Sequence, residues 1–146
     1  MKQVIFKLIT VSSLCLFFSF NKKEPHYTNI TQDLNPKQES IVRGEKIYMD
    51  HCSRCHLPDG KGVPGETPPL ANSNWLIEKP NEVIHAIKYG LKGKIEVNGI
   101  PYKGFMPKQK MESQQTADVM NYIMNSWGNK NDKLISIDDI EAVTKK

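Results

Sequence analysis

The motif CSRCH, from Cys52 to His56, constrains this chain more than any other feature of its sequence. Two cysteines separated by two residues and followed at once by a histidine suit four kinds of chemistry. They can form a structural metal site, a thiol redox pair, a short disulfide or an attachment point for a larger group. With three cysteines and four histidines in 146 residues, the string would arise by chance in roughly one shuffled sequence per thousand. The motif is therefore a functional signal.

Three of these four chemistries lack residues that they need. A structural zinc site takes about four ligands, usually from a second Cys or His pair, and the other histidines, His26, His51 and His85, are isolated. A thioredoxin-like redox pair follows a buried strand, whereas the residues before Cys52 have a helical pattern. A disulfide within the motif would close a very short loop and leave His56 without a role.

Covalent haem attachment uses every residue of the motif. The thiols of Cys52 and Cys55 can each add to a vinyl group to form a thioether, and His56 is placed to bind the iron. Ser53 and Arg54 are then spacers. A domain rich in glycine and proline has little apolar core of its own, so a bound macrocycle would also stabilise the fold. We therefore expect one covalently attached haem c.

The first 20 residues resemble an export signal. Lys2 and Lys7 give a positive start, and the uncharged apolar run at 8–20 has 13 residues. A transmembrane helix needs roughly 20 apolar residues, so this run fits a signal-peptide core better. A clear small-residue cleavage site is missing near Ser19, which leaves an uncleaved anchor and a membrane tether as the alternative. We expect an exported protein, in the periplasm or at the periplasmic face of the inner membrane.

The rest of the chain divides into three parts. Residues 21–36 are polar, with prolines at both ends and no apolar period, and we interpret them as a linker. Residues 37–129 form the domain. Residues 130–146 form a C-terminal tail with a short helix capped by Ser136.

Apolar periodicity predicts an α-helical domain with long loops. A first helix runs into the motif, a second is opened near Pro80 and closed by Gly90 or Gly93, and a third is capped by Ser113. Asn98-Gly99 marks a tight turn between short extended pieces. The residues that share a helical face are Ile41, Gly44, Tyr48 and Cys52 in the first helix, Val83, Ile84, Ile87 and Leu91 in the second, and Thr116, Val119, Met120, Ile123 and Trp127 in the third.

The sixth iron ligand decides between an electron carrier and an open, reactive iron. Met106 stands in YKGFMP, which we expect to be a loop, and Pro107 stiffens the backbone behind it. Such a loop can approach a haem without helical constraint, so Met106 is the predicted second axial ligand. An open iron would instead need a distal acid or base, for which His85 is the candidate.

Four stretches occur in the order typical of class I c-type cytochromes, from about Gly44 to Trp127: RGEKIYMDHCSRCHLPDGKG, TPPLANSNW, EVNGIPYKGFMP and DVMNYIMNSWGN. The chain resembles this small monohaem family, and most of all exported bacterial members that serve oxidases, nitrite reductases or quinoprotein dehydrogenases. The resemblance implies an all-α fold of three to five helices wrapped around one haem. It also implies that the N-terminal helix crosses the C-terminal one, with Gly44 and Tyr48 against Val119 and Tyr122.

The same resemblance assigns roles around the haem. The carbonyl of Pro68, or alternatively of Pro69, would accept a hydrogen bond from the axial histidine and raise its donor strength. Leu70 would pack on the haem. Trp75 would lie near a propionate or serve packing alone.

The leading interpretation is an exported monohaem cytochrome that carries single electrons between respiratory redox partners by Fe(III)/Fe(II) cycling. We expect an electron carrier and not an enzyme, acting alone or as a subunit of an oxidoreductase complex. The alternative is a catalytic or gas-sensing haem domain with an open sixth site. A net charge of +4 without a recognition motif argues against nucleic acid. The segment 88–110 holds six lysines against Glu96 alone, a charge that could favour docking to an acidic partner.

Overall fold

The computed structural model describes residues 34–146. The predicted signal or anchor at 1–20, and all but the last residues of the predicted linker at 21–36, lie outside the described residues. Within the described part, none of the helices has the length and apolar character needed to cross a bilayer.

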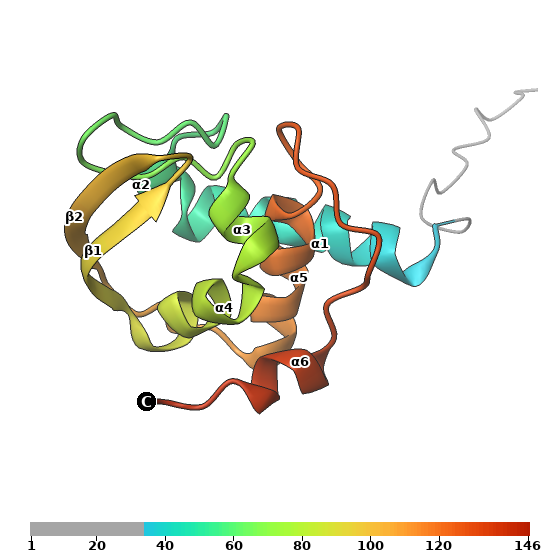
Figure 1. The fold of residues 1–146 in the computed structure, drawn as a ribbon. Helices are drawn as coiled ribbons and strands as arrows, with labels where there is room; N and C mark the ends of the chain where they lie inside the picture. Colours follow the sequence, from blue (N-terminus) through green and yellow to red (C-terminus); the bar gives the residue numbers. More distant parts are fainter. Residues whose placement is uncertain (1–33) are drawn as a thin grey trace, which may run out of the picture.

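Most of the fold is helical, and a single antiparallel hairpin lies at one side of the helices in the described chain (Figure 1). The described chain has six helices instead of the expected three to five, because two short ones, of four and five residues, interrupt its loops. In chain order the elements are α1 (Pro36–His51), α2 (Ser53–His56), α3 (Asn74–Glu78), α4 (Pro80–Tyr89), β1 (Leu91–Val97), β2 (Ile100–Met106), α5 (Ser113–Ile123) and α6 (Ile137–Ala142).

Capping interactions fix where α1 begins and how it reaches the motif. The Asn35 side chain accepts a hydrogen bond from the backbone N–H of Gln38, whose own side chain accepts one from the Asn35 N–H. Pro36 supplies a φ angle suited to the first turn. The helix therefore starts one residue before the predicted domain boundary and ends directly at Cys52, as the sequence predicted.

Helix α1 crosses α5 at a glycine. A Cβ atom at Gly44 would lie 2.0 Å from the backbone oxygen of Asp118 and 2.8 Å from the Cβ of Tyr122. Beside this contact, the rings of Tyr48 and Tyr122 are 5.5 Å apart between centroids. The predicted crossing is confirmed, although the atoms nearest to the glycine belong to Asp118 and Tyr122 and not to Val119.

A buried carboxylate joins the same two helices. Asp118 is 2% exposed and accepts hydrogen bonds from Ser40 at 2.6 Å and from two nitrogens of Arg43, each at 2.9 Å. Because its charge is paired and hydrogen-bonded, burial of this group is tolerated. The start of α5 is also set by side chains: the Glu112 N–H donates to the Gln115 side chain, so the cap lies one residue before the predicted Ser113.

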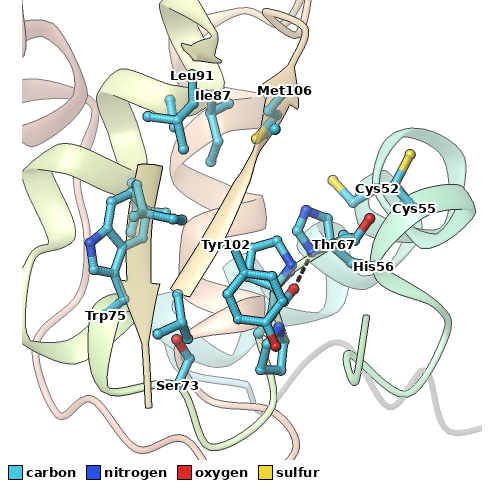
Figure 2. A pocket seen from close by; sticks show the side chains of 18 of the residues that line it. Cys52, Cys55, His56, Thr67, Ser73, Trp75, Ile87, Leu91, Tyr102 and Met106 are labelled. Atoms are coloured by element: carbon cyan, nitrogen blue, oxygen red, sulfur yellow. Dashed lines mark hydrogen bonds between the residues drawn. The ribbon is translucent and has the colours of Figure 1, made fainter. Parts of the chain in front are cut away.

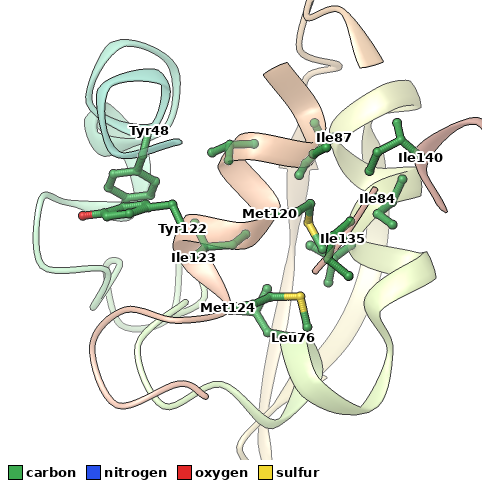
Figure 3. Packing of buried hydrophobic residues seen from close by; sticks show 13 residues of the cluster. Tyr48, Leu76, Ile84, Ile87, Met120, Tyr122, Ile123, Met124, Ile135 and Ile140 are labelled. Carbon is green, nitrogen blue, oxygen red and sulfur yellow. The ribbon is translucent and has the colours of Figure 1, made fainter. Parts of the chain in front are cut away.

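The apolar core lies between α1, α4 and α5, and the C-terminal segment closes it (Figure 3). Asn121 on α5 pairs with the backbone of Ile135 through two hydrogen bonds of 2.9 Å. Ile140 on α6 is 1% exposed, and Lys88 on α4 donates to the carbonyls of Ile140 and Val143. The segment predicted as a tail therefore packs on the domain. It contains the predicted short helix, α6, which is capped by Ser136 as predicted.

This packing predicts that Ile140→Ala costs about 2–5 kcal/mol of unfolding free energy, since truncating a buried isoleucine loses burial and leaves a cavity. Denaturant unfolding of the haem-containing protein measures the effect. Ile137→Ala, on the same helix at a side chain 39% exposed, is the matched control and should cost well under half as much. Equal small losses in both variants would mean that α6 does not contribute to the core.

The hairpin β1–β2 has two faces with different surroundings. Its strands pair from Leu91 with Met106 to Val97 with Ile100, around an Asn98-Gly99 turn in which both residues have positive φ, as the sequence predicted. The side chains that share the inner face are Leu91, Ile95, Val97, Tyr102 and Met106, and those that share the outer face are Lys92, Lys94, Glu96, Pro101, Lys103 and Phe105.

The tip of this hairpin is fastened to the start of α3. The backbone N–H of Asn74 donates to the Asn98 side chain at 2.9 Å, and the N–H of Asn98 donates to the Asn74 side chain at 2.8 Å. In a third bond, the side-chain amide of Asn98 donates to the carbonyl of Asn72. An isolated two-stranded hairpin is marginally stable in water, so these bonds help to hold the sheet in place.

Candidate haem site

The motif folds into the short helix α2, which turns His56 inward. His56 is 9% exposed, whereas Cys52 is half-buried and Cys55 is exposed, and both cysteines are free. The Nδ1 atom of His56 lies 3.1 Å from the carbonyl oxygen of Pro68. Because a carbonyl can only accept, Nδ1 carries the proton and Nε2 keeps its lone pair. The imidazole is thereby fixed in a form that can bind a metal.

The loop after the motif is ordered, as its glycines and prolines predicted. The N–H groups of Leu70 and Ala71 both donate to the carbonyl of Gly60, at 2.7 and 2.9 Å. A Cβ at Gly60 would lie 2.5 Å from the Trp127 ring, and the residue has a positive φ, so only glycine fits there. Tyr48 donates to the carbonyl of Leu57 at 2.5 Å and ties the loop to α1.

A cavity of 470 Å³ opens between the motif, the loop at 66–70, helices α3 and α4, and the inner face of the hairpin. All seven residues predicted for the haem site line it: Cys52, Cys55, His56, Pro68, Leu70, Trp75 and Met106. Figure 2 shows the His56 ring and the Met106 sulfur facing this cavity from different elements. The sequence expected Met106 in a loop, but it is the last residue of β2.

Burial sets the protonation of the groups in the cavity. Burial lowers the pKa of His56, and the hydrogen bond to Pro68 offsets part of this effect. Neutral imidazole, the form that binds metals, is therefore favoured. Burial also raises the pKa of the Cys52 thiol to about 11, and the neighbouring Cys55 adds to the rise. Within residues 34–146, no three His, Cys, Asp or Glu side chains gather in a cluster that could hold a metal ion.

Comparison with known proteins identifies the family. The cytochrome c family model matches residues 41–127, which include the motif and Met106. The chain belongs to the cytochrome c family. Cytochrome c-552 of Thermus thermophilus is 38% identical over 90 residues, which cover 58% of this chain and 68% of the relative.

Two further relatives are parts of dehydrogenases. The cytochrome c subunit of alcohol dehydrogenase (quinone) from Gluconobacter oxydans is 32% identical over 104 residues, 68% of this chain and 21% of the relative. The gluconate 2-dehydrogenase cytochrome c subunit of Pantoea cypripedii is 30% identical over 138 residues, 87% of this chain and 31% of the relative. This cytochrome thus spans between a fifth and a third of those subunits.

Membership of the family means that this cytochrome has a class I fold, binds haem c covalently and carries electrons. The cavity fits a flat, mostly apolar macrocycle. Gly93 and Gly104 pair directly across the inner face of the hairpin, and both line the cavity. A Cβ at Gly93 would meet no protein atom within 4 Å. The hairpin therefore presents bare backbone to the cavity at this position, which leaves room for a broad ring.

Sequence reasoning missed part of this wall. Tyr102 is buried and lines the cavity. It lies on the same face of β2 as Gly104 and Met106, because every second residue of a strand points to the same side. The sequence pattern that could have identified Tyr102 is the alternation of inward and outward side chains along β2, which can be used only once this segment is recognised as a strand. His85, the candidate distal group of the open-iron alternative, is not among the cavity-lining residues of the described chain, and its ring packs against Tyr89.

Proposed function

We propose that this cytochrome is an exported carrier of single electrons with His56 and Met106 as axial iron ligands. One observation carries the proposal: an anchored imidazole and a methionine sulfur face the same cavity (Figure 2). When bound, the haem supplies one-electron cycling between Fe(III) and Fe(II). A thioether ligand favours the reduced form and raises the potential.

The surrounding residues hold and orient the cofactor. Cys52 and Cys55 would anchor it by thioether bonds, a role supported by the fact that both residues line the cavity with His56. The hydrogen bond from His56 to Pro68 fixes the ring orientation and makes Nε2 a stronger donor. Leu70 would supply an apolar contact, and Trp75, which also lines the cavity, would lie near a propionate or serve packing alone.

The partners are redox proteins, either an oxidase, a reductase or a dehydrogenase of a respiratory chain. The relatives named as cytochrome subunits of dehydrogenases support this class of partner. Export is supported by the sequence of residues 1–20, whose short apolar run follows two lysines. The protein then works in the periplasm, either free or tethered at the periplasmic face of the inner membrane.

Carbon monoxide distinguishes this function from its alternative. We expect the reduced protein to resist carbon monoxide at neutral pH, because a six-coordinate iron has no free position. The measurement is the visible spectrum of the reduced protein before and after adding the gas. Rapid conversion to a carbon monoxide adduct would contradict closed ligation and favour a gas-sensing or catalytic haem domain.

A further inference from the structure

We propose that the outer face of the β1–β2 hairpin is the docking surface for an acidic redox protein, with Phe105 as its apolar contact. This inference rests on the proposed electron-carrying function and adds the place and chemistry of docking. The hairpin stands at one side of the molecule, with the helices behind it (Figure 1). Its inner face lines the haem cavity, so a partner on the outer face is separated from the cofactor by a single layer of sheet.

The charge of the described chain is concentrated at this hairpin and just beyond it. Residues 88–110 hold six lysines and one glutamate, a net charge of +5, and all of these side chains except Lys88, which lies on α4, belong to the hairpin or to the segment just beyond it. The remainder of residues 34–146 holds ten basic and thirteen acidic side chains, a net charge of −3. The protein is therefore an electric dipole with its positive end at one wall of the haem cavity. Such a field orients an acidic partner during approach and raises the association rate.

The lysines of the outer face are not explained by pairing within the chain. Lys94 lies directly opposite Lys103, and Lys92 lies opposite Phe105. Like charges directly opposite each other destabilise a sheet. Within residues 34–146, none of the three lysines forms an ion pair with an acidic side chain. The arrangement opposes folding and leaves these charges available to a partner.

Protection against aggregation explains the lysines of this face but not Phe105. Both strands are sheet edges, and exposed lysines on edge strands discourage pairing with other chains. Phe105 contradicts that explanation, because it is 72% exposed, the highest value among the large apolar side chains of the described chain. An exposed aromatic ring on an edge strand invites association. A basic rim around an aromatic residue is instead typical of a protein interface.

Phe105 also links the surface to the cofactor. It borders the cavity and directly precedes Met106, the proposed iron ligand. Docking there would bring a partner next to the residue that holds the iron. The alternative surface is the one around the exposed Cys55, which lies with α2 away from the strands of the hairpin (Figure 2). Residues 50–61 around Cys55 hold two acidic and two basic side chains, so this surface lacks the net positive charge of the hairpin, and an acidic partner is better attracted to the hairpin.

The test uses plastocyanin, an acidic blue-copper protein, as the probe. Stopped-flow spectroscopy measures the second-order rate at which ferrous cytochrome, Fe(II), transfers one electron to Cu(II), giving Fe(III) and Cu(I). We expect the wild-type rate to fall about tenfold or more from 10 to 200 mM salt, because screening weakens the steering field. Lys94→Glu/Lys103→Glu should lower the low-salt rate about tenfold. The control variant Lys46→Glu/Lys130→Glu makes the same charge change at two positions outside the hairpin, on α1 and beyond α5. It should alter the low-salt rate less than about threefold.

A second variant separates the apolar contribution of Phe105 from the electrostatic contribution of the lysines. Phe105→Ser should lower the rate at every salt concentration and leave the slope against salt unchanged, since it removes contact area and no charge. The midpoint potential and the visible spectrum of each variant are recorded first, so that a changed haem site is not mistaken for lost docking.

Three results would overturn the docking surface. One is a rate that is the same in Lys94→Glu/Lys103→Glu as in the matched charge control. Another is a larger loss in Lys61→Glu, in the loop after the cysteine motif, than in the hairpin variants. The third is a Phe105→Ser protein that reacts like the wild type. Failure of the electron-carrier function is distinguishable, because the wild-type protein would then bind carbon monoxide or fail to cycle reversibly between its two oxidation states.

Discussion

Replacing Met106 by alanine should lower the midpoint potential on the order of tenths of a volt, because axial ligands alone move haem potentials over ~0.8 V. A thioether stabilises the ferrous form, and its loss leaves that position to water or to no ligand. The same variant should bind carbon monoxide rapidly when reduced. Spectroelectrochemistry gives the potential, and the visible spectrum reports the sixth ligand.

A matched methionine controls for general disturbance. Met111 is half-buried and packs against the core, but it does not line the cavity in the described chain. Met111→Ala should therefore lose stability and keep the wild-type potential and its resistance to carbon monoxide. A Met106→Ala protein with an unchanged potential would contradict the ligand assignment. Retained His56 ligation is checked in both variants by the spectrum of the oxidised form.

Much of the haem site was predictable from sequence because its signals are local. The two cysteines and His56 are adjacent in the chain, so the attachment chemistry follows from a single motif. Helix α4 begins at Pro80, as predicted, and ends before Gly90, the first of the two glycines that were candidates for its end. The Asn98-Gly99 turn was likewise readable from two residues. Each of these features depends on neighbours in the sequence.

The features that sequence reasoning missed depend on distant contacts. Helix α3 has only five residues. It is held by the cap at Ser73 and by the reciprocal hydrogen bonds between Asn74 and Asn98, which lie 24 positions apart in the sequence. Met106 was expected in a loop because a glycine and a proline flank it, but strand pairing with Leu91 decides its conformation. Cross-strand register determines which side chains face the haem, and no local pattern fixes it.

Gly44→Ala should destabilise the protein by about 2 kcal/mol or more, although helix propensity alone predicts the opposite. In a solvent-exposed helix, alanine is favoured over glycine by roughly 1 kcal/mol. At this position the added carbon would lie 2.0 Å from the Asp118 oxygen, a backbone atom that no rotamer change can move. Overpacking of a tight interface typically costs about 1–3 kcal/mol, and α1 has to shift away from α5 to relieve this contact. The steric term therefore outweighs the propensity term.

The loss should appear as a melting temperature lower by about 10 °C for a domain of this size, measured on the haem-containing protein. Lys46→Ala, two residues along on the exposed side of α1, isolates the propensity effect and should change stability by less than about 0.5 kcal/mol. A Gly44→Ala protein as stable as the wild type would mean that the helices can separate freely at the crossing. Because α1 runs directly into Cys52, such freedom would also loosen the haem attachment, so the wild-type glycine secures the fold and the site together.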